Sequence, residues 1–423
     1  MRNLYTLLWI LALPLVLARL YSRARKEPGY GQHIAERFGR YTESISVAPV
    51  IWVHAVSVGE TRAAEPLVRQ LMQEWPQHRI LLTHMTPTGR ATGTMLFQQE
   101  LASGRLVQNY LPYDIPFLIE RLLHHFKPSI CILMETEVWP NLIYACHRQS
   151  IPVALVNARL SPKSLKKANR LSALIRPASA AINCVAAQTA SDADRIKQLG
   201  APHVVVTGNS KFDVTVPDQN IAAGALLRRQ WGNRKVLVCA STREGEEELI
   251  LDAFLKAAAD NLLLVIVPRH PQRFDLVEQL LHQRQIPMLR KSGLNHDLVP
   301  EEIQVVLGDT MGELASYFVS CDLAFIGGSL LPLGGQNLIE ACAVARPVLI
   351  GPHTFNFDAI SADAIEGGAA IRVRDASELM ARAKELLRDD ARRTAMGQKA
   401  LAFAHLHRGA TARTVALLKN LMQ

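Results

Sequence analysis

The sequence predicts an α/β protein with two doubly wound domains behind an apolar amino-terminal segment. Three observations carry this prediction. The 423 residues exceed one ordinary hydrophobic core and indicate two domains. From Val50 onward, short apolar runs alternate with stretches of helical spacing, as in parallel sheets covered by helices on both faces. Residues 3–18 carry no charged side chain.

The uncharged segment NLYTLLWILALPLVLA predicts a membrane anchor. As a helix it would be ~24 Å long at ~1.5 Å per residue, somewhat short of a hydrocarbon core of ~30 Å. Arg2 and Arg19 flank it and can reach the lipid headgroups. Basic side chains stay on the cytoplasmic side, so the collar of residues 19–26 predicts a cytoplasmic body. A cleaved signal peptide and a helix lying in the membrane plane are the alternatives.

The composition excludes several classes of function. The 47 basic and 38 acidic side chains give a net charge of +9, and the first 26 residues supply five of the basic ones and no acidic one. The remaining +4 is too diffuse to indicate a nucleic-acid partner, and no nucleic-acid-binding motif is present. Six scattered cysteines without a C-x-x-C pair indicate small core residues in a reducing compartment.

The predicted strands divide the chain into two halves. Those of the first half are Val50–Val56, Arg79–Thr83, Leu106–Tyr110, Ser129–Met134, Pro152–Val156, Ala181–Ala186 and Val204–Val206. Those of the second half are Lys235–Cys239, Leu262–Val267, Gln304–Leu307, Leu323–Ile326 and Pro347–Ile350. Residues 213–224 are polar and rich in turn formers, which is typical of a linker. We therefore predict an anchor and collar over residues 1–26, one domain over 27–212 and another over 213–423.

Ligands of doubly wound sheets bind beyond the carboxyl ends of the strands, so the residues that follow strands are the candidates. Glu60 follows the first strand in HAVSVGE. Its place in a first helical turn favours the ionised carboxylate, which can act as a general base. Glu135 and Glu137 follow another strand and would face one side of an extended chain, so that one has a raised pKa or a cationic partner. Lys211 in GNSKFD is placed for an anionic group. The alternatives are a helix-terminal glutamate, a helix cap and a solvated lysine.

In the second half, Arg269 closes a strand and can pair with a phosphate. The glycine-rich loop over residues 327–337 precedes a predicted helix over 338–345, whose exposed N–H groups would bind an anion. A purely structural loop is the alternative. Asp192-Ala193-Asp194 matches a metal motif of some glycosyltransferases, but it follows Thr189 and is typical of a helix cap. The sequence therefore predicts no metal site.

Seven of these segments together resemble one family. They are HAVSVGE, LMETEVWPN, NARLSPKS, TGNSKFD, STREGEE, VPRHPQR and GGSLLPLGGQNLIEA, in order from His54 to Ala341. The family is that of the 3-deoxy-D-manno-octulosonic acid (Kdo) transferases of lipopolysaccharide synthesis. With the amino-terminal segment, the resemblance covers nearly the whole chain.

The resemblance implies a GT-B fold, in which two Rossmann-like domains face a cleft. It implies transfer of Kdo from CMP-Kdo to the lipid A precursor at the cytoplasmic face of the inner membrane, with inversion and without a metal or other cofactor. Glu60 would be the base, with Glu135 and Lys211 assisting in the transition state. The residues that would bind CMP are Pro268, Arg269, Asp309, Thr310, Met311, Gly335, Gln336, Asn337 and Leu338.

Two other functions fit parts of the sequence. One is a different membrane-associated GT-B transferase that uses a UDP-sugar. The other is an anchored, non-catalytic protein that binds nucleotide sugars, although Glu60 and the glycine-rich loop are both present. The sequence leaves open how many Kdo residues are added.

Overall fold

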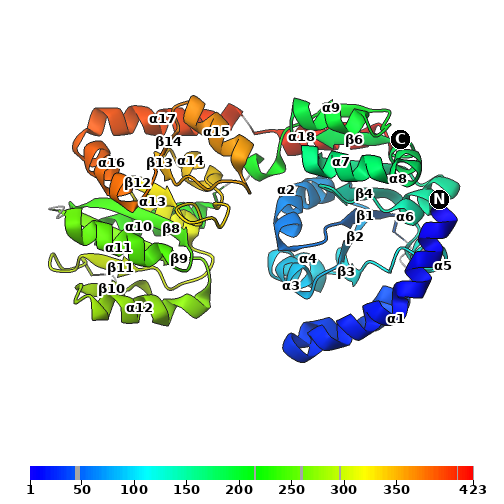
Figure 1. Cartoon of the computed structure of the whole chain (residues 1–423), viewed down its shortest axis with the longest axis horizontal. Coiled ribbons are helices and arrows are strands. Elements are labelled where there is room, and N and C mark those ends of the chain that lie inside the picture. The colour runs from blue at the N-terminus through cyan, green and yellow to red at the C-terminus, as the bar shows by residue number, and fades with distance from the viewer. Residues whose placement is uncertain (43–47, 214–215, 258–260, 295–296, 407, 423) are drawn as a thin grey trace. The chain divides into compact units, whose positions relative to one another are not determined.

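The computed structural model describes the chain except residues 43–47, 214–215, 258–260, 295–296, 407 and 423. It contains two compact units, Met1–Asp213 with His407–Gln423, and Val214–Leu406. Helix α18 (Ala410–Lys419) thus belongs to the first unit, whereas the sequence analysis assigned all residues from 213 onward to the second. The Asp213 carboxylate accepts hydrogen bonds from the backbone N–H groups of Gly409 and Thr411, each over 2.5 Å. These bonds and the buried Val415 hold α18 on the first unit (Figure 1).

The first unit is built on a seven-stranded sheet in the order β3-β2-β1-β4-β5-β6-β7, and all of its strand pairs are parallel. Its strands are β1 (Val50–His54), β2 (Arg79–His84), β3 (Leu106–Tyr110), β4 (Pro128–Met134), β5 (Val153–Ala158), β6 (Cys184–Ala187) and β7 (Val204–Val206). Every strand predicted for this half is present. Because all pairs are parallel, the carboxyl ends of the strands meet at one edge.

Helices cover both faces of this sheet. They are α1 (Arg2–Lys26), α2 (Val58–Glu74), α3 (Pro87–Leu96), α4 (Gln98–Ala102), α5 (Pro116–Phe126), α6 (Pro140–Arg148), α7 (Pro162–Arg170), α8 (Ser172–Ala180) and α9 (Ala190–Lys197), with 3₁₀ turns η1 (Pro28–Gly31), η2 (Ile34–Phe38) and η3 (Ser210–Asp213). Side chains of β1 alternate between two cores, so that Trp52 packs with the α5 and α6 side while Ile51 and Val53 pack with α2. This alternation follows from the period of two along a strand.

The second unit repeats the design, with the parallel order β10-β11-β9-β8-β12-β13-β14. Its strands are β8 (Lys235–Thr242), β9 (Leu262–Pro268), β10 (Met288–Arg290), β11 (Val305–Leu307), β12 (Leu323–Ile326), β13 (Val348–Ile350) and β14 (Ala370–Arg372). Strands β10 and β14 were not predicted from the sequence. Both are three-residue edge strands, too short to show a pattern.

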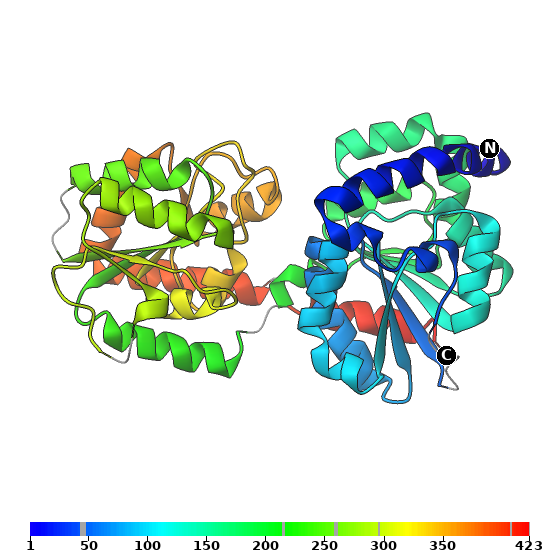
Figure 2. The same ribbon diagram turned by 90° about the horizontal axis from the view of Figure 1, so that it is seen from below.

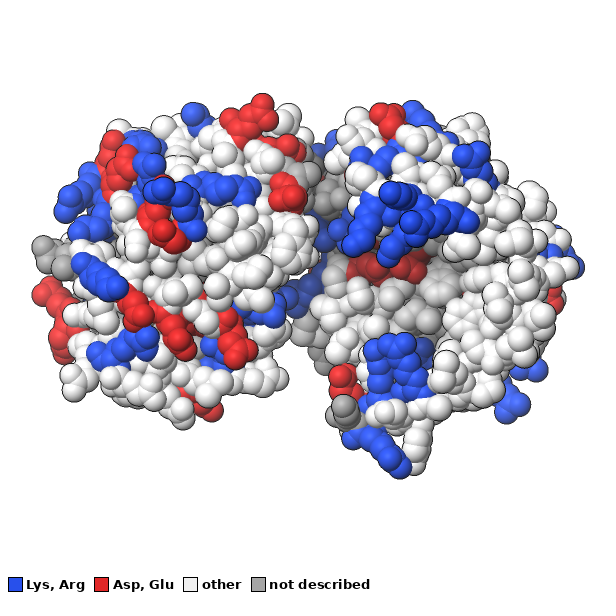
Figure 3. Space-filling view, in the orientation of Figure 1, with Lys and Arg blue, Asp and Glu red and all other residues white. Residues whose placement is uncertain are grey.

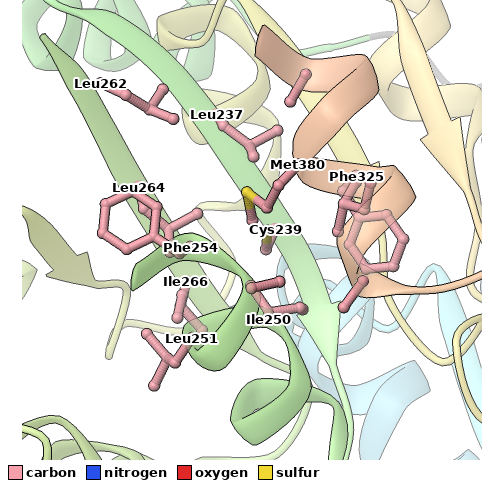
Figure 4. Packing of buried hydrophobic residues seen from close by; sticks show 14 of the residues in the cluster. Leu237, Cys239, Ile250, Leu251, Phe254, Leu262, Leu264, Ile266, Phe325 and Met380 are labelled. Carbon is pink, nitrogen blue, oxygen red and sulfur yellow. The ribbon is translucent and has the colours of Figure 1, made fainter. Parts of the chain in front are cut away.

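The helices of this unit pack on a continuous apolar core. They are α10 (Asp218–Gln230), α11 (Glu246–Ala257), α12 (Phe274–Gln283), α13 (Leu314–Ser320), α14 (Ile339–Ala343), α15 (Asp358–Glu366), α16 (Ala376–Arg388) and α17 (Asp390–Leu406), with the 3₁₀ turns η4 (Pro271–Arg273) and η5 (Lys291–Gly293). Figure 4 shows Leu237 and Cys239 of β8 beside Phe254 of α11 and Met380 of α16. All six cysteines are buried and unpaired, as predicted.

The predicted linker is shorter than expected. Its residues from Asp218 onward form the first turns of α10, and Gly224 of that helix is buried. A Cβ at Gly224 would lie 2.4 Å from the Cβ of Val319. That glycine therefore allows α10 to approach α13 closely, and it does not mark a flexible segment.

Candidate active site

Glu60 lies at the start of α2, beyond the carboxyl end of β1. Ser57 caps the helix, and the Glu60 carboxylate accepts hydrogen bonds from the backbone N–H groups of Val56 and Ser57, the latter over 3.1 Å. This reciprocal arrangement is a capping box, which fixes the side chain at the helix start. The carboxylate is thus oriented by its own helix terminus.

The electrostatic surroundings of Glu60 differ from the sequence-based expectation. The helix start favours ionisation, but burial raises the pKa of Glu60, and the nearby Glu137 and Glu135 raise it further, to about 7. The two backbone N–H groups lower it by less. A carboxylate with a pKa near neutrality is well matched to proton transfer at physiological pH.

Glu135 is the first residue after β4, and its backbone adopts the left-handed conformation with φ +54°. The chain turns here, with a hydrogen bond from Glu137 N to Met134 O, so it is not the extended segment that the sequence analysis assumed. The side chain of Glu135 is buried. Its carboxylate is 2.9 Å from the Arg159 guanidinium and 3.6 Å from Lys211 Nζ. The predicted cationic partner of Glu135 is therefore present, and there are two of them, Arg159 and Lys211.

Lys211 is brought to Glu135 by the hydrogen bonds of η3. The Asn157 side chain at the end of β5 accepts from Ser210 N over 3.1 Å, and Ser210 Oγ donates to Ala63 O of α2 over 2.8 Å. Lys211 N donates to the Asn209 side chain over 3.0 Å. The segment that carries Lys211 is thus fastened to β5 and to α2, and Lys211 lies in one region with Glu135 and Glu60.

Two further side chains belong to this region. Glu137 accepts a hydrogen bond from Trp139 Nε1 over 2.8 Å, and burial is the main reason why the pKa of Glu137 is raised. Arg159 was not predicted as a functional residue. Its position after β5 and the motif NARLSPKS were the available signals, but the ion pair to Glu135 becomes visible only when β4 and β5 are adjacent.

Helix α7 begins three residues after Arg159 and carries a stripe of cations. Lys163, Lys166, Lys167 and Arg170 recur at helical spacing and are all exposed. Within the described part of the chain, none of them has an ion pair with an acidic side chain. Figure 3 shows Lys and Arg gathered over α7 beside a patch of Asp and Glu. Like charges at this spacing destabilise a helix slightly, so the stripe is not explained by the stability of α7.

In the second unit, basic residues gather beyond the ends of β8 and β9. Arg269 follows Pro268, the last residue of β9, and its backbone N–H donates to Thr242 O over 2.9 Å. Burial lowers the pKa of the neighbouring His270, and the charges of Arg243, Arg269 and Arg273 lower it further. This strand edge therefore carries a positive field suited to an anionic ligand.

The glycine-rich loop follows β12 as predicted and is closed by a hydrogen bond from Gly335 N to Gly328 O over 2.6 Å. The predicted helix over 338–345 is only α14, five residues long. It is too short to bind an anion through a helix dipole, which corrects the sequence-based expectation. Gly335, Gln336, Asn337 and Leu338 precede it as loop residues. Any contact that they make to a ligand comes from the loop itself.

Glu246 holds the glycine-rich loop, and the sequence analysis missed it. This fully buried carboxylate accepts hydrogen bonds from the backbone N–H groups of Gly328 over 2.6 Å, Leu330 over 2.9 Å and Arg243 over 2.9 Å. Burial raises its pKa, while these donors oppose the rise. The segment STREGEE is thus the anchor of the loop.

Asp309, Thr310 and Met311 follow β11. The Asp309 carboxylate accepts from Ser292 N over 2.8 Å and from Ser292 Oγ over 2.5 Å. Thr310 donates to Glu313, and Met311 is exposed. Asp309 and Thr310 are therefore fixed by neighbouring loops, while the Met311 side chain is open to solvent.

Comparisons with known proteins show the family of the chain. A family model described as 3-deoxy-D-manno-octulosonic-acid transferase (kdotransferase) matches residues 32–214. The 3-deoxy-D-manno-octulosonic acid transferase of Bordetella pertussis is 43% identical over 427 residues, covering 99% of this chain and 99% of that protein. The chain belongs to the Kdo transferases. The Haemophilus influenzae Kdo transferase is 38% identical, covering 100% of this chain and 99% of that protein.

Solved structures of lower identity share the fold. The UDP-GlcNAc 2-epimerase from Neisseria meningitidis, solved with UDP-GlcNAc, has a TM-score of 0.57 at 18% identity and covers 88% of this chain and 100% of that one. This likeness confirms a GT-B-like fold of two parallel-sheet α/β domains. Kdo transferase activity makes the chain a glycosyltransferase of lipopolysaccharide synthesis.

Proposed function

We propose that this Kdo transferase moves Kdo from CMP-Kdo to a phosphorylated lipid, the lipid A precursor, with inversion at the anomeric carbon and with Glu60 as the general base. The observation that carries the proposal is the state of Glu60. Its carboxylate is held at a helix start, partly shielded from water, and its pKa is about 7. No other carboxylate of the predicted catalytic set combines these properties, because Glu135 is engaged by two cations.

The proposed reaction is a single displacement. The acceptor hydroxyl oxygen attacks the anomeric carbon of Kdo and forms the new glycosidic bond. The bond from that carbon to the CMP phosphate oxygen breaks, and its electron pair leaves with CMP. The hydroxyl proton passes to the Glu60 carboxylate. Attack on the side opposite to the leaving group inverts the configuration.

Glu135 and Lys211 have a positioning and electrostatic role in this proposal. The pair Glu135–Arg159 holds the acidic loop after β4 in its turn, and Lys211 adds a positive charge 3.6 Å from Glu135 Oε1. A cation at this position stabilises the negative charge that develops as CMP leaves.

The donor would be bound by the second unit. Arg269 and the neighbouring Arg243 supply charge for the CMP phosphate, and Arg is suited to bidentate contact with phosphate oxygens. The glycine-rich loop, fastened by Glu246, would present backbone N–H groups to the donor. Pro268, Asp309, Thr310, Met311 and the loop residues 335–338 complete the proposed donor site.

The acceptor would be bound by the first unit. A phosphorylated lipid is anionic and lies in a membrane. The cations of α7 begin close to Arg159. Among the residues that the structure describes, one helix, Arg2–Arg25, is long and apolar enough to cross a membrane. We propose that this helix holds the body at the cytoplasmic face of the inner membrane.

The proposed reaction needs no metal and no other cofactor. Among the described residues, no group of three His, Cys, Asp or Glu side chains is arranged to hold a metal ion. Asp192 of the D-x-D sequence accepts from Thr189 Oγ1 over 2.6 Å at the start of α9, and its backbone N–H donates to the same oxygen, so Asp192 takes part in a helix cap. Protein cations can stabilise the departing phosphate without a metal.

A donor-exchange experiment tests the proposal. The purified full-length chain is incubated with the lipid A precursor and either CMP-Kdo or a UDP-sugar, and the lipid products are resolved by mass. We expect Kdo addition with CMP-Kdo alone, and competition by CMP but not by UDP. Sugar transfer from the UDP-sugar, or competition by UDP alone, would overturn the donor assignment.

A further inference from the structure

Helix α1 lies against the body of the first unit along much of its length, as Figure 2 shows. Its half-buried and buried side chains recur at positions 2, 5, 6, 9, 12, 13, 16, 20 and 24, which is the spacing of one helix face. Trp9 lies 5.9 Å from Tyr113 between ring centroids, and Leu13 and Val16 pack on the cluster of Tyr113, Ile115 and Leu118. One side of α1 is therefore partly covered by protein.

A buried polar group fastens this face of α1. Tyr5 Oη donates to the Asp114 carboxylate over 2.9 Å, and the same carboxylate accepts from Asn141 N over 3.1 Å and Leu142 N over 2.8 Å. Thr6 Oγ1 and the Asn141 amide exchange hydrogen bonds over 2.9 and 3.2 Å. Asp114 is fully buried. Lifting α1 away would remove Tyr5 from this carboxylate and break both bonds between Thr6 and Asn141.

The opposite face of α1 is an apolar stripe open to the surroundings. Leu4, Leu7, Leu8, Leu11 and Leu15 are 50%, 51%, 57%, 67% and 74% exposed. The stripe contains no charge, while Arg2 precedes it and Arg19, Arg23 and Arg25 follow it. An apolar surface of this kind with cations at its ends is complementary to lipid chains beneath anionic headgroups.

We propose that α1 lies in the plane of the membrane with this leucine stripe among the lipids, and that it does not span the bilayer. A spanning helix would have to leave Asp114 and Asn141 and the aromatic contact of Trp9. The in-plane arrangement keeps all of these contacts and still buries the exposed leucines. The inference rests on the proposed membrane location of the chain and specifies how the helix meets the membrane.

The position of the two helix ends tests the proposal. Asn3 and Ser22 are both exposed and lie near opposite ends of α1, and the six native cysteines are buried. Full-length variants Asn3→Cys and Ser22→Cys are expressed in cells, and spheroplasts are treated with a membrane-impermeant maleimide before or after lysis. The unmodified chain gives the background.

We expect both introduced cysteines to react on the same side, and only after lysis. Reaction of Asn3→Cys before lysis and of Ser22→Cys only after it would show a spanning helix and overturn the proposal. Reaction of both before lysis would support the in-plane helix and refute the cytoplasmic location. The labelling result does not depend on Kdo transfer, so the in-plane helix and the proposed function can be refuted separately.

Binding to vesicles of phosphatidylethanolamine and phosphatidylglycerol tests whether the leucine stripe contacts lipids. The double variant Leu11→Gln/Leu15→Gln should bind these vesicles at least tenfold more weakly than the unmodified chain. Its control is Leu255→Gln/Leu276→Gln in the second unit, where the two leucines are 44% and 54% exposed, and binding should stay within twofold. Equal binding by both double variants would overturn the proposal. The proposal would also be overturned if the chain formed a dimer in solution and Leu11→Gln/Leu15→Gln abolished that dimer without affecting vesicle binding. The leucine stripe would then contact a second copy of the chain.

Discussion

The ionisation of Glu60 predicts a specific pH dependence of Kdo transfer. Its pKa rises from an ordinary 4.5 to about 7, mainly through burial and then through Glu137 and Glu135. With that pKa, about one tenth of the carboxyl groups are ionised at pH 6 and about nine tenths at pH 8. Because the base acts only when ionised, kcat/KM should rise roughly tenfold over this range. An unperturbed glutamate would give almost no change.

Two substitutions isolate this effect. Glu60→Gln keeps an oxygen that can accept the capping hydrogen bonds of Ser57 but cannot take a proton, so transfer should fall roughly 10²–10⁴-fold while CMP binding is retained. Glu137→Gln removes a negative charge near Glu60, so the rise in kcat/KM should move to lower pH. The assay measures Kdo transfer to detergent-dispersed acceptor between pH 5.5 and 8.5. A flat profile for the unmodified chain, or near-normal turnover by Glu60→Gln, would show that Glu60 is not the base.

The same pKa has a consequence for stability. The folded chain binds the Glu60 proton more tightly than the unfolded chain does. The stability that the protonated Glu60 contributes to the folded chain is therefore fully present below pH 4.5 and is lost as the pH rises through about 7. Glu60→Gln removes this loss, so its Tm relative to the unmodified chain should increase from pH 5 to pH 8. A constant difference in Tm would show that the pKa of Glu60 is not raised.

Three further predictions concern donor, acceptor and loop. Arg269→Ala should weaken CMP binding in calorimetry by roughly 1.5–3 kcal/mol, and added magnesium should not restore it; rescue by magnesium would contradict a metal-free donor site. Lys166→Glu/Lys167→Glu should raise the KM for the phosphorylated acceptor with little change in CMP affinity, and an unchanged KM would remove α7 from the acceptor surface. Glu246→Ala leaves three N–H groups without their carboxylate and should lower the free energy of unfolding by about 3 kcal/mol. The exposed Glu248→Ala on the same helix is its control in urea unfolding, and equal stabilities would contradict the anchoring role.

The sequence predicted the parallel sheets because their strands are buried on both faces and are therefore apolar almost throughout. It placed Leu106–Tyr110 and Leu323–Ile326 correctly at both ends. It could not predict β10 and β14, since three residues at a sheet edge carry no periodicity. It also could not assign α18 to the first unit, because that placement depends on hydrogen bonds between Asp213 and residues almost 200 positions away.

In the candidate site, too, features set by local sequence could be predicted, and features set by contacts between distant segments could not. Residues that follow a strand within one motif, such as Glu60 and Lys211, could be predicted as candidates from local sequence. Arg159 and Glu246 were missed because their partners come from other strands. The pKa of Glu60 was expected to favour the ionised form, since the helix start is visible in sequence whereas burial and the acids after β4 are not.

The role of Glu60 is tested most sharply by the stereochemistry of Kdo transfer without metal and by its dependence on this base. The full-length chain and Glu60→Gln are incubated with CMP-Kdo and the lipid A precursor in excess EDTA, and the lipid product is characterised by mass and by the NMR configuration of its new anomeric centre. We expect the unmodified chain to form a Kdo–lipid with the configuration opposite to that of the donor, and Glu60→Gln to form almost none. Retained configuration, loss of activity in EDTA that magnesium restores, or comparable product from Glu60→Gln would contradict this expectation.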